Sequence, residues 1–244
     1  MAEANNTATL TLGTSHFQEA NQRVREALED HDEIMLEEVY AQRYLGCAMP
    51  AGKSLKIHGV PGNDMASYMD GGAIEVFGNA QDQIGNTMNG GLVVVHGRCG
   101  DAAGYAMRGG EIFIRDDCGW RVGIHMKQFE DKRPVIFIGG DAGSFLGEYM
   151  AGGIIVLLGD AGEHLATGMH GGVIYLLQEL SPDRVPEGLV LEAVDATDEA
   201  LLAGLIARYD GFFAEDGCKV KAQPKDFFRL RPASSRPYAD MYAH

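Results

Sequence analysis

The sequence predicts an all-β protein: a single-stranded, right-handed parallel β-helix of about six to seven 19-residue turns, with a helical N-terminal extension and a C-terminal helix plus tail. Two observations predict this fold. Glycine accounts for 33 of the 244 residues, and 26 of these lie between residues 59 and 172. In the same region methionine recurs every 19 residues, with one short apolar run per interval. A helical repeat needs about 33 residues or more, so a 19-residue unit fits one turn of stacked strands about 4.8 Å apart.

The methionines set the period. They form two series with a spacing of 19, Met69, Met88, Met107 and Met126, then Met150 and Met169. The interval from Met126 to Met150 is five residues longer, and the surplus lies in the polar stretch Lys127–Pro134, because Val135 to Ile154 is again 19. Pro50 occupies the register one period before Met69. An apolar methionine ladder is typical of a core, and a soft-metal or cofactor site is the less favoured interpretation.

Glycine pairs follow most of these methionines in a Met-X-Gly-Gly pattern. We expect them at the corners of the turns, where positive φ or a close approach of neighbouring backbones excludes a side chain. The structural motif residues are Gly71, Gly72, Gly90, Gly91, Gly109, Gly110, Gly152, Gly153, Gly171 and Gly172.

One strand per turn is predicted from the apolar runs. The strands are expected at Ala73–Phe77, Leu92–His96, Glu111–Arg115, Val135–Ile138, Ile154–Leu158 and Val173–Leu177. Two inward columns result, because residues two apart on a strand share a face. One column runs from Ile74 to Ile174 and the other from Val76 to Leu176.

The flanks divide the chain into three predicted parts. Residues 1–48 contain a helix over Ser15–Leu28, with Ser15 and Gln18 as a capping box, and an entry strand. Residues 49–178 form the β-helix. Residues 179–244 contain a helix over Thr197–Tyr209 and a basic tail, which we expect to pack on the β-helix or on a partner.

Charge and composition exclude several classes of partner. The net charge of −15 argues against nucleic acid and anionic membranes. No apolar run reaches the length of roughly 18 residues that a membrane-spanning helix needs. Since no secretory cysteine framework is present either, a cytoplasmic protein is expected.

No catalytic, cofactor-binding or metal-ligating residue is predicted. Gly52-Lys53-Ser54 lacks the first glycine of a phosphate-binding loop, and residues 139–143 lack dinucleotide-binding spacing. His58 and His96 lie two turns apart, too far for one zinc ion. Cys99 and Cys118 stack on adjacent turns, where a packing role is favoured over a disulfide. Asp117, Asp141 and Asp160 share a column, for which exposure or pairing is favoured over a catalytic dyad.

A candidate partner face lies on the outer side of the strands. The expected residues are Phe113, Phe137, Val156 and Tyr175, where alternation of polar and apolar residues is lost. Continuous apolar runs mark strands buried on both faces. Either the chain's own C-terminal segment or a partner subunit should therefore cover this face.

The repeat also carries a family resemblance. Residues 148–159 and 166–175 resemble the C-terminal GXGXG β-helix domain of the glutamate synthase large subunit. Residues 62–64 resemble the Asn-Asp turn of that domain, residues 42–46 its entry strand, and residues 201–209 and 219–230 its closing helix and last strand. The Met-X-Gly-Gly repeat alone is shared with one of the subunits of formylmethanofuran dehydrogenase and with one of those of N-methylglutamate synthase.

The resemblance implies a non-catalytic scaffold subunit of a glutamate synthase-type complex, without cofactors in this chain. Glutamine hydrolysis and FMN-dependent reductive amination of 2-oxoglutarate would occur on partners. These are a glutamine amidotransferase subunit, an FMN-binding synthase subunit with iron–sulfur clusters, and an electron-donor subunit. The alternatives are a subunit of an N-methylglutamate synthase or formylmethanofuran dehydrogenase-like complex, and an independent β-helix hydrolase or lyase.

Overall fold

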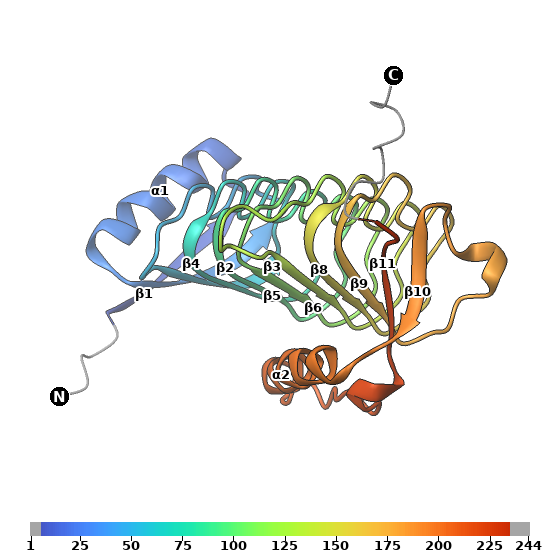
Figure 1. The fold of residues 1–244 in the computed structure, drawn as a ribbon. Helices are drawn as coiled ribbons and strands as arrows, with labels where there is room; N and C mark the ends of the chain where they lie inside the picture. Colours follow the sequence, from blue (N-terminus) through green and yellow to red (C-terminus); the bar gives the residue numbers. More distant parts are fainter. Residues whose placement is uncertain (1–5, 235–244) are drawn as a thin grey trace, which may run out of the picture.

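A long parallel β-solenoid forms the body of the molecule (Figure 1). The computed structural model describes residues 6–234. In its single sheet the first nine strands neighbour one another in chain order. The eleventh strand then lies between the ninth and the tenth. The predicted fold class is confirmed, with about eight turns instead of six to seven. Three strands that precede Met69 join the same sheet, Thr7–Gly13, Glu33–Tyr40 and Ser54–Val60.

The described elements alternate as the repeat predicts. The strands are β1 (Thr7–Gly13), β2 (Glu33–Tyr40), β3 (Ser54–Val60), β4 (Asp70–Phe77), β5 (Gly90–Val95), β6 (Glu111–Ile114), β7 (Val135–Ile138), β8 (Ala151–Leu157), β9 (Gly171–Leu176), β10 (Leu189–Ala193) and β11 (Phe228–Pro232). The helices are α1 (Phe17–Asp30) and α2 (Ala196–Phe212), with short 3-10 turns η1 (Pro182–Arg184) and η2 (Pro224–Asp226).

The register of the sheet matches the predicted columns. Ile74 pairs with Val93, and Val93 with Ile112, in steps of 19. The step from Ile112 to Ile136 is 24, because the insertion lies between β6 and β7. The side chains of both inward columns are buried and, with the methionine ladder, form the main core.

Each corner holds three alternate residues in the left-handed region. In one turn these are Gln83, Gly85 and Thr87, with φ between 54° and 66°. The outer two donate their N–H groups to the next turn and the middle one donates to the preceding turn, at 2.7–2.8 Å. Buried backbone groups must be paired, and this alternation links each inner corner to both of its neighbours.

The first turn corrects one prediction. Pro50 pairs with Asp70, which places Met49, and not Pro50, one period before Met69. The turn is one residue longer because four residues separate Met49 from Ser54, whereas three separate Met69 from Ala73, which pairs with Ser54. Residues 42–46, expected as an entry strand, form the first corner instead, and β2 precedes them.

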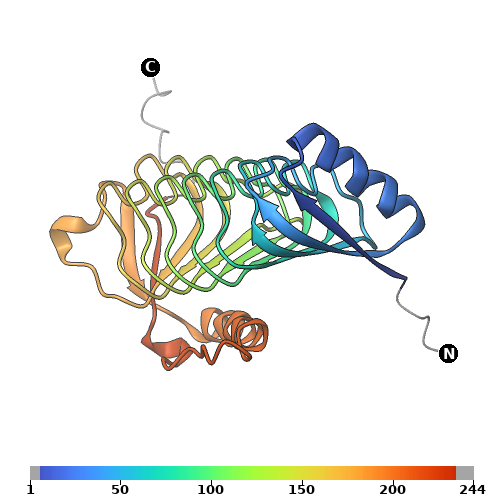
Figure 2. The same ribbon diagram turned by 180° about the vertical axis from the view of Figure 1, so that it is seen from behind.

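Both ends of the main core are closed by other elements. Helix α1 joins β1 to β2 at the N-terminal end, where its Ala20 and Val24 belong to the main core (Figure 2). Its N-cap is His16, which accepts from the N–H of Gln18, so the predicted capping box at Ser15 is wrong; Ser15 instead donates to the carbonyl of Leu12. At the other end β11 pairs antiparallel with both β9 and β10.

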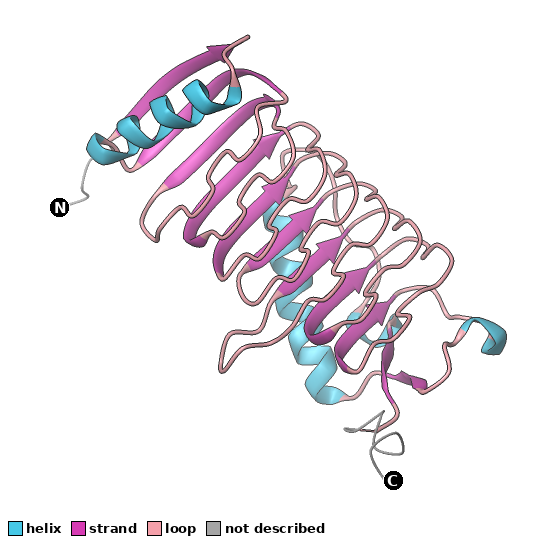
Figure 3. Cartoon of the chain, turned by 90° about the horizontal axis from the view of Figure 1, so that it is seen from above, coloured by secondary structure: helices cyan, strands magenta, loops and turns pink. Residues whose placement is uncertain are grey.

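Helix α2 lies across the outer face of the sheet (Figure 3). Asp195 caps its N-terminus in a reciprocal pair with Asp198. The helix buries Leu202, Leu205 and Tyr209 against the later strands and creates a second core. The predicted tail forms η2 and β11, and its residues 235–244 lie outside the described part of the chain.

Candidate functional site

The predicted partner face lies beneath the chain's own C-terminal segment. Phe113, Phe137, Val156 and Tyr175 are each at most 2% exposed. The Phe113 ring lies 4.9 Å from that of Phe212, and the Phe137 ring 4.7 Å from that of Tyr209. Of the two covers that the sequence left open, the structure contains the chain's own segment. These four residues are therefore covered within the chain and are not exposed to a partner.

A buried hydrogen bond fixes the start of α2 on this face. The Tyr175 hydroxyl donates to Asp198 at 2.6 Å, and burial followed by this hydrogen bond raises the pKa of Tyr175. Arg229 of β11 pairs with Asp198 at 2.7 Å and with Glu192 at 2.8 Å. Hydrogen bonds to Glu192 and Asp195 raise the pKa of Arg229. The group ties α2 to β10 and β11.

His96 fixes the segment that follows α2. Its ring nitrogens lie 3.0 Å from Glu75 and 2.6 Å from Asp216. The hydrogen bond to Glu75 and the contacts with Asp216 outweigh burial and raise the pKa of His96. Arg115 approaches Asp216 at 3.3 Å. These contacts attach the segment that follows α2 to the solenoid, so their role is structural.

The motif glycines have two distinct roles. The second glycine of each pair has positive φ and lies over a methionine of the preceding turn: a Cβ on Gly91 would lie 2.7 Å from the Met69 Cε and 2.5 Å from a carbonyl oxygen. The first glycine lies close to the backbone of a neighbouring turn, and of the five first glycines only Gly71 also has positive φ, at 147°. A Cβ at Gly109, Gly152 or Gly171 would approach a backbone atom at 2.4 Å, whereas Gly90 has no neighbour closer than 3.6 Å.

The polar columns stabilise the turns. The Asp117 carboxylate accepts the N–H of Asp141 at 3.0 Å, and Asp141 accepts that of Asp160 at 2.7 Å. Each carboxylate thus holds the backbone of the next turn. Cys99 and Cys118 are buried free thiols, and a hydrogen bond between them, followed by burial, raises the pKa of Cys99.

The histidines predicted to be too far apart for zinc lie on either side of Phe77. The rings of His58 and His96 stack on it at 4.7 and 5.0 Å. Residues 6–234 contain no group of three or more His, Cys, Asp or Glu side chains arranged to hold a metal ion.

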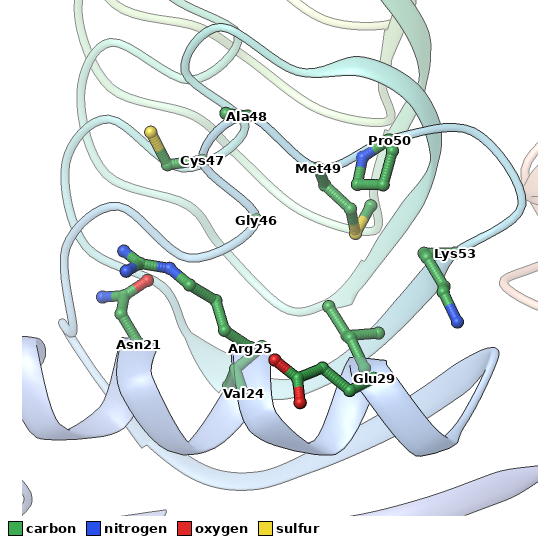
Figure 4. Close-up of a pocket in the computed structure, with 11 residues that line it drawn as sticks. Asn21, Val24, Arg25, Glu29, Gly46, Cys47, Ala48, Met49, Pro50 and Lys53 are labelled. Atoms are coloured by element: carbon green, nitrogen blue, oxygen red, sulfur yellow. The ribbon is translucent and has the colours of Figure 1, made fainter.

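An apolar cleft of about 450 Å³ opens between α1 and the first turn (Figure 4). Arg25 and Glu29 lie along one wall, on α1, and Cys47 and Met49 lie on the facing corner. Lys53 at the end of the cleft pairs with Asp32 at 3.0 Å.

The thiol that lines this cleft, Cys47, is not activated as a nucleophile. Burial raises the pKa of the Cys47 thiol despite the nearby Arg25, so the thiol is protonated at neutral pH and is a poor nucleophile. The sequence analysis did not identify this cleft. The sequence feature that could have indicated it is a pair of polar residues, Asn21 and Arg25. They lie one helical turn apart beside the buried Val24.

These features define a class of protein, a parallel β-helix with glycine-rich corners and a helix covering one outer face. The chain belongs to the GXGXG motif family, whose model matches residues 33–219. In the described residues no helix is both long enough and apolar enough to cross a membrane.

Two similar proteins extend this result. The uncharacterized protein MJ1350 of Methanocaldococcus jannaschii is 50% identical over 147 residues, which cover 59% of this chain and 56% of that protein. The chain thus matches little more than half of that relative. A chain of the formyltransferase/hydrolase complex FhcABCD of Methylorubrum extorquens, solved in complex with methylofuran, is 26% identical with a TM-score of 0.63. That similarity covers 73% of this chain and 67% of that chain.

Proposed function

We propose that this protein is a non-catalytic structural subunit of a multi-subunit enzyme complex. The observation that carries the proposal is the GXGXG match over residues 33–219, supported by the same fold in a chain of a formyltransferase/hydrolase complex. A rigid solenoid suits this role, because its stacked turns present extended surfaces at fixed spacing.

The resemblance of the flanking segments favours a glutamate synthase-type complex within this class. In this proposal a glutamine amidotransferase subunit releases ammonia, and an FMN and iron–sulfur subunit uses it in reductive amination of 2-oxoglutarate. An electron-donor subunit supplies the reductant. The present chain holds these subunits in place in the cytoplasm, where its free thiols remain reduced.

We place the main partner contact on an exposed aromatic ridge, defined as Tyr105, His125 and Tyr149 together with Tyr68. Tyr68 occupies the same corner position as His125 and Tyr149, separated from His125 by the turns of Thr87 and Ala106. Tyr68, Tyr105 and Tyr149 are 55%, 39% and 45% exposed. The His125 ring lies 5.9 Å from that of Tyr105 and 5.4 Å from that of Tyr149. Aromatic residues are enriched at protein interfaces, and these lie on the corners, away from the covered outer face.

Coexpression with the candidate partners tests the proposal. The chain should co-purify with the amidotransferase and FMN subunits, and the mixture should form glutamate from glutamine and 2-oxoglutarate. Tyr68→Asp with Tyr149→Asp should abolish co-purification without lowering the melting temperature, because aspartate tolerates the positive φ of both positions. Tyr40→Asp is the control, since Tyr40 is equally aromatic and 61% exposed but lies off the ridge. Glutaminase or glutamate synthase activity of the chain alone would contradict a non-catalytic role.

A formyl-transferring complex is the second candidate, and the structural similarity to a chain of FhcABCD favours it. Co-purification with formyltransferase and hydrolase subunits, and not with an amidotransferase, would select this alternative.

A further inference from the structure

A second cleft lies on the side of the solenoid where the residue X of Met-X-Gly-Gly recurs. Asp70, Asn89 and Arg108 occupy this position on three successive turns, and Lys127 follows Met126 at the equivalent position of the next turn. Their cleft has a volume of about 370 Å³ and is completed by Phe129 and Lys132.

The insertion after Met126 folds back over these turns. Phe129 and Lys132 exchange backbone hydrogen bonds at 3.2 and 3.0 Å, which makes a tight hairpin. Lys132 then reaches Asp70, far earlier in the chain, at 3.3 Å. The hairpin thereby brings a third cationic side chain to the cleft.

The charges in the cleft are unbalanced. Three cations, Arg108, Lys127 and Lys132, face one carboxylate, and that carboxylate is already paired with Lys132. The resulting charge of about +2 stands out on a chain whose net charge is −15.

Arg108 has no counter-ion among the described residues. Its side chain is half-buried, and its Nε is buried with no hydrogen-bond partner in that part of the chain. Within residues 6–234, no ion pair or side-chain hydrogen bond engages Arg108, Lys127 or the amide of Asn89. Buried polar groups without a partner call for an explanation, and a guanidinium binds paired oxygens in a bidentate manner.

We propose that this cleft binds a small oxyanion carrying two negative charges, of the phosphate or dicarboxylate type. Arg108 holds a pair of its oxygens, Lys127 supplies the second positive charge, and the Asn89 amide donates an orienting hydrogen bond. Lys132 closes the site from the hairpin. The cleft has the size of a small-molecule site, and the proposal does not depend on the partner subunits.

Calorimetric titration of the full chain with inorganic phosphate and, separately, with succinate tests the site at constant ionic strength. At least one should bind saturably with one site per chain, and the comparison identifies the type of anion. Arg108→Gln should weaken binding at least tenfold, and Lys127→Gln several-fold. Lys225→Gln makes the same charge change at an exposed position outside the cleft and should bind as the wild type does.

Lys127→Gln keeps the test decisive if Arg108→Gln fails to fold, because Lys127 is exposed and outside the core. The proposal is overturned if neither anion binds saturably, or if the Lys127 variant binds as tightly as the Lys225 variant.

Discussion

Single residues at the corners decide whether a turn can stack on the next one. Gly91 and Gly90 are neighbours in sequence, yet only Gly91 has positive φ, at 99°, and lies against the backbone of the preceding turn. The two glycines of one motif thus carry different constraints, and the structure separates them.

Gly91→Ala should destabilise the fold by about 3 kcal/mol, because alanine is strained at this φ and its Cβ would lie 2.5 Å from the Gly71 carbonyl oxygen. Gly90→Ala is the matched control and should change the free energy of unfolding by less than about 1 kcal/mol. Chemical denaturation measures both. Equal effects of the two substitutions would contradict the assigned roles.

His96 makes the attachment of the C-terminal segment depend on pH. Its pKa is raised in the folded state by Glu75 and Asp216, so its contribution is complete below the unfolded pKa of about 6.5 and is lost as the pH rises through the folded pKa. The wild type should therefore lose more thermal stability than His96→Gln between pH 6 and pH 9.

Asp216→Asn should reduce the same pH dependence, since it removes one of the two carboxylates bound to His96. If the melting temperatures of wild type and His96→Gln change equally with pH across this range, the contacts of His96 do not depend on its protonation.

At the level of elements, side chains at the corners and side chains on the strands are matched in size. Five corner glycines each leave room for the Cδ1 of an isoleucine on the second strand that follows, since a Cβ there would lie 2.4–2.8 Å from that atom. The pairs are Gly46 with Ile74, Gly85 with Ile112, Gly104 with Ile136, Gly123 with Ile155, and Gly147 with Ile174. By the same register Ala66 faces Val93, a residue that lacks the Cδ1. A larger corner residue is thus matched by a smaller strand residue.

Substitutions at Ala66 and Val93 that make the corner side chain smaller and the strand side chain larger test this matching of sizes. Val93→Ile alone should cost about 1–3 kcal/mol, because the added methyl meets the Ala66 side chain in a closely packed core. Ala66→Gly should rescue it, so that the double variant is more stable than Val93→Ile by most of that amount. Denaturant unfolding of the four proteins gives the coupling energy. Additive effects would show that the two positions do not touch.

At the level of the whole molecule, the solenoid is a series of equivalent turns with specialised ends. Helix α1 closes the N-terminal end of the main core, and α2 covers the outer face only of later strands, from Val94 onward. The turn between Met49 and Met69 lies outside that cover and is the one that contains an extra residue.

Deleting the whole turn Pro50–Met69 should therefore preserve the fold, because Asp70 would then follow Met49 in register and the second core would stay intact. A deletion at the same site that is one residue longer should prevent folding, since a slip of one residue exchanges the two faces of every later strand. A deletion that is one residue shorter leaves four residues between Met49 and Ala73, as the wild type has between Met49 and Ser54, and should fold. Circular dichroism and melting curves distinguish the three proteins. Similar melting of all three would refute the register.

The period, the inward columns and the position of the insertion could all be predicted from the sequence. Each depends on side chains that recur once per turn, and stacking in register forces equivalent positions into one column. The left-handed residues at positions such as Gln83 or Thr87 were not predicted, because their conformation is held by hydrogen bonds to neighbouring turns. The register predicted for Pro50 is wrong by one residue, because the motif does not reveal the extra residue in the first turn.

The cover of the outer face could be identified only from the three-dimensional packing. The apolar character of Phe113 and Tyr175 predicted a cover, but the choice between the chain's own segment and a partner depended on contacts such as Phe113 with Phe212 and His96 with Asp216. These contacts join parts of the chain that are far apart in sequence, beyond any local periodicity. The two clefts arise in the same way, from α1 and the hairpin folding onto other turns. The local repeat therefore determines the solenoid, and long-range packing determines its surfaces.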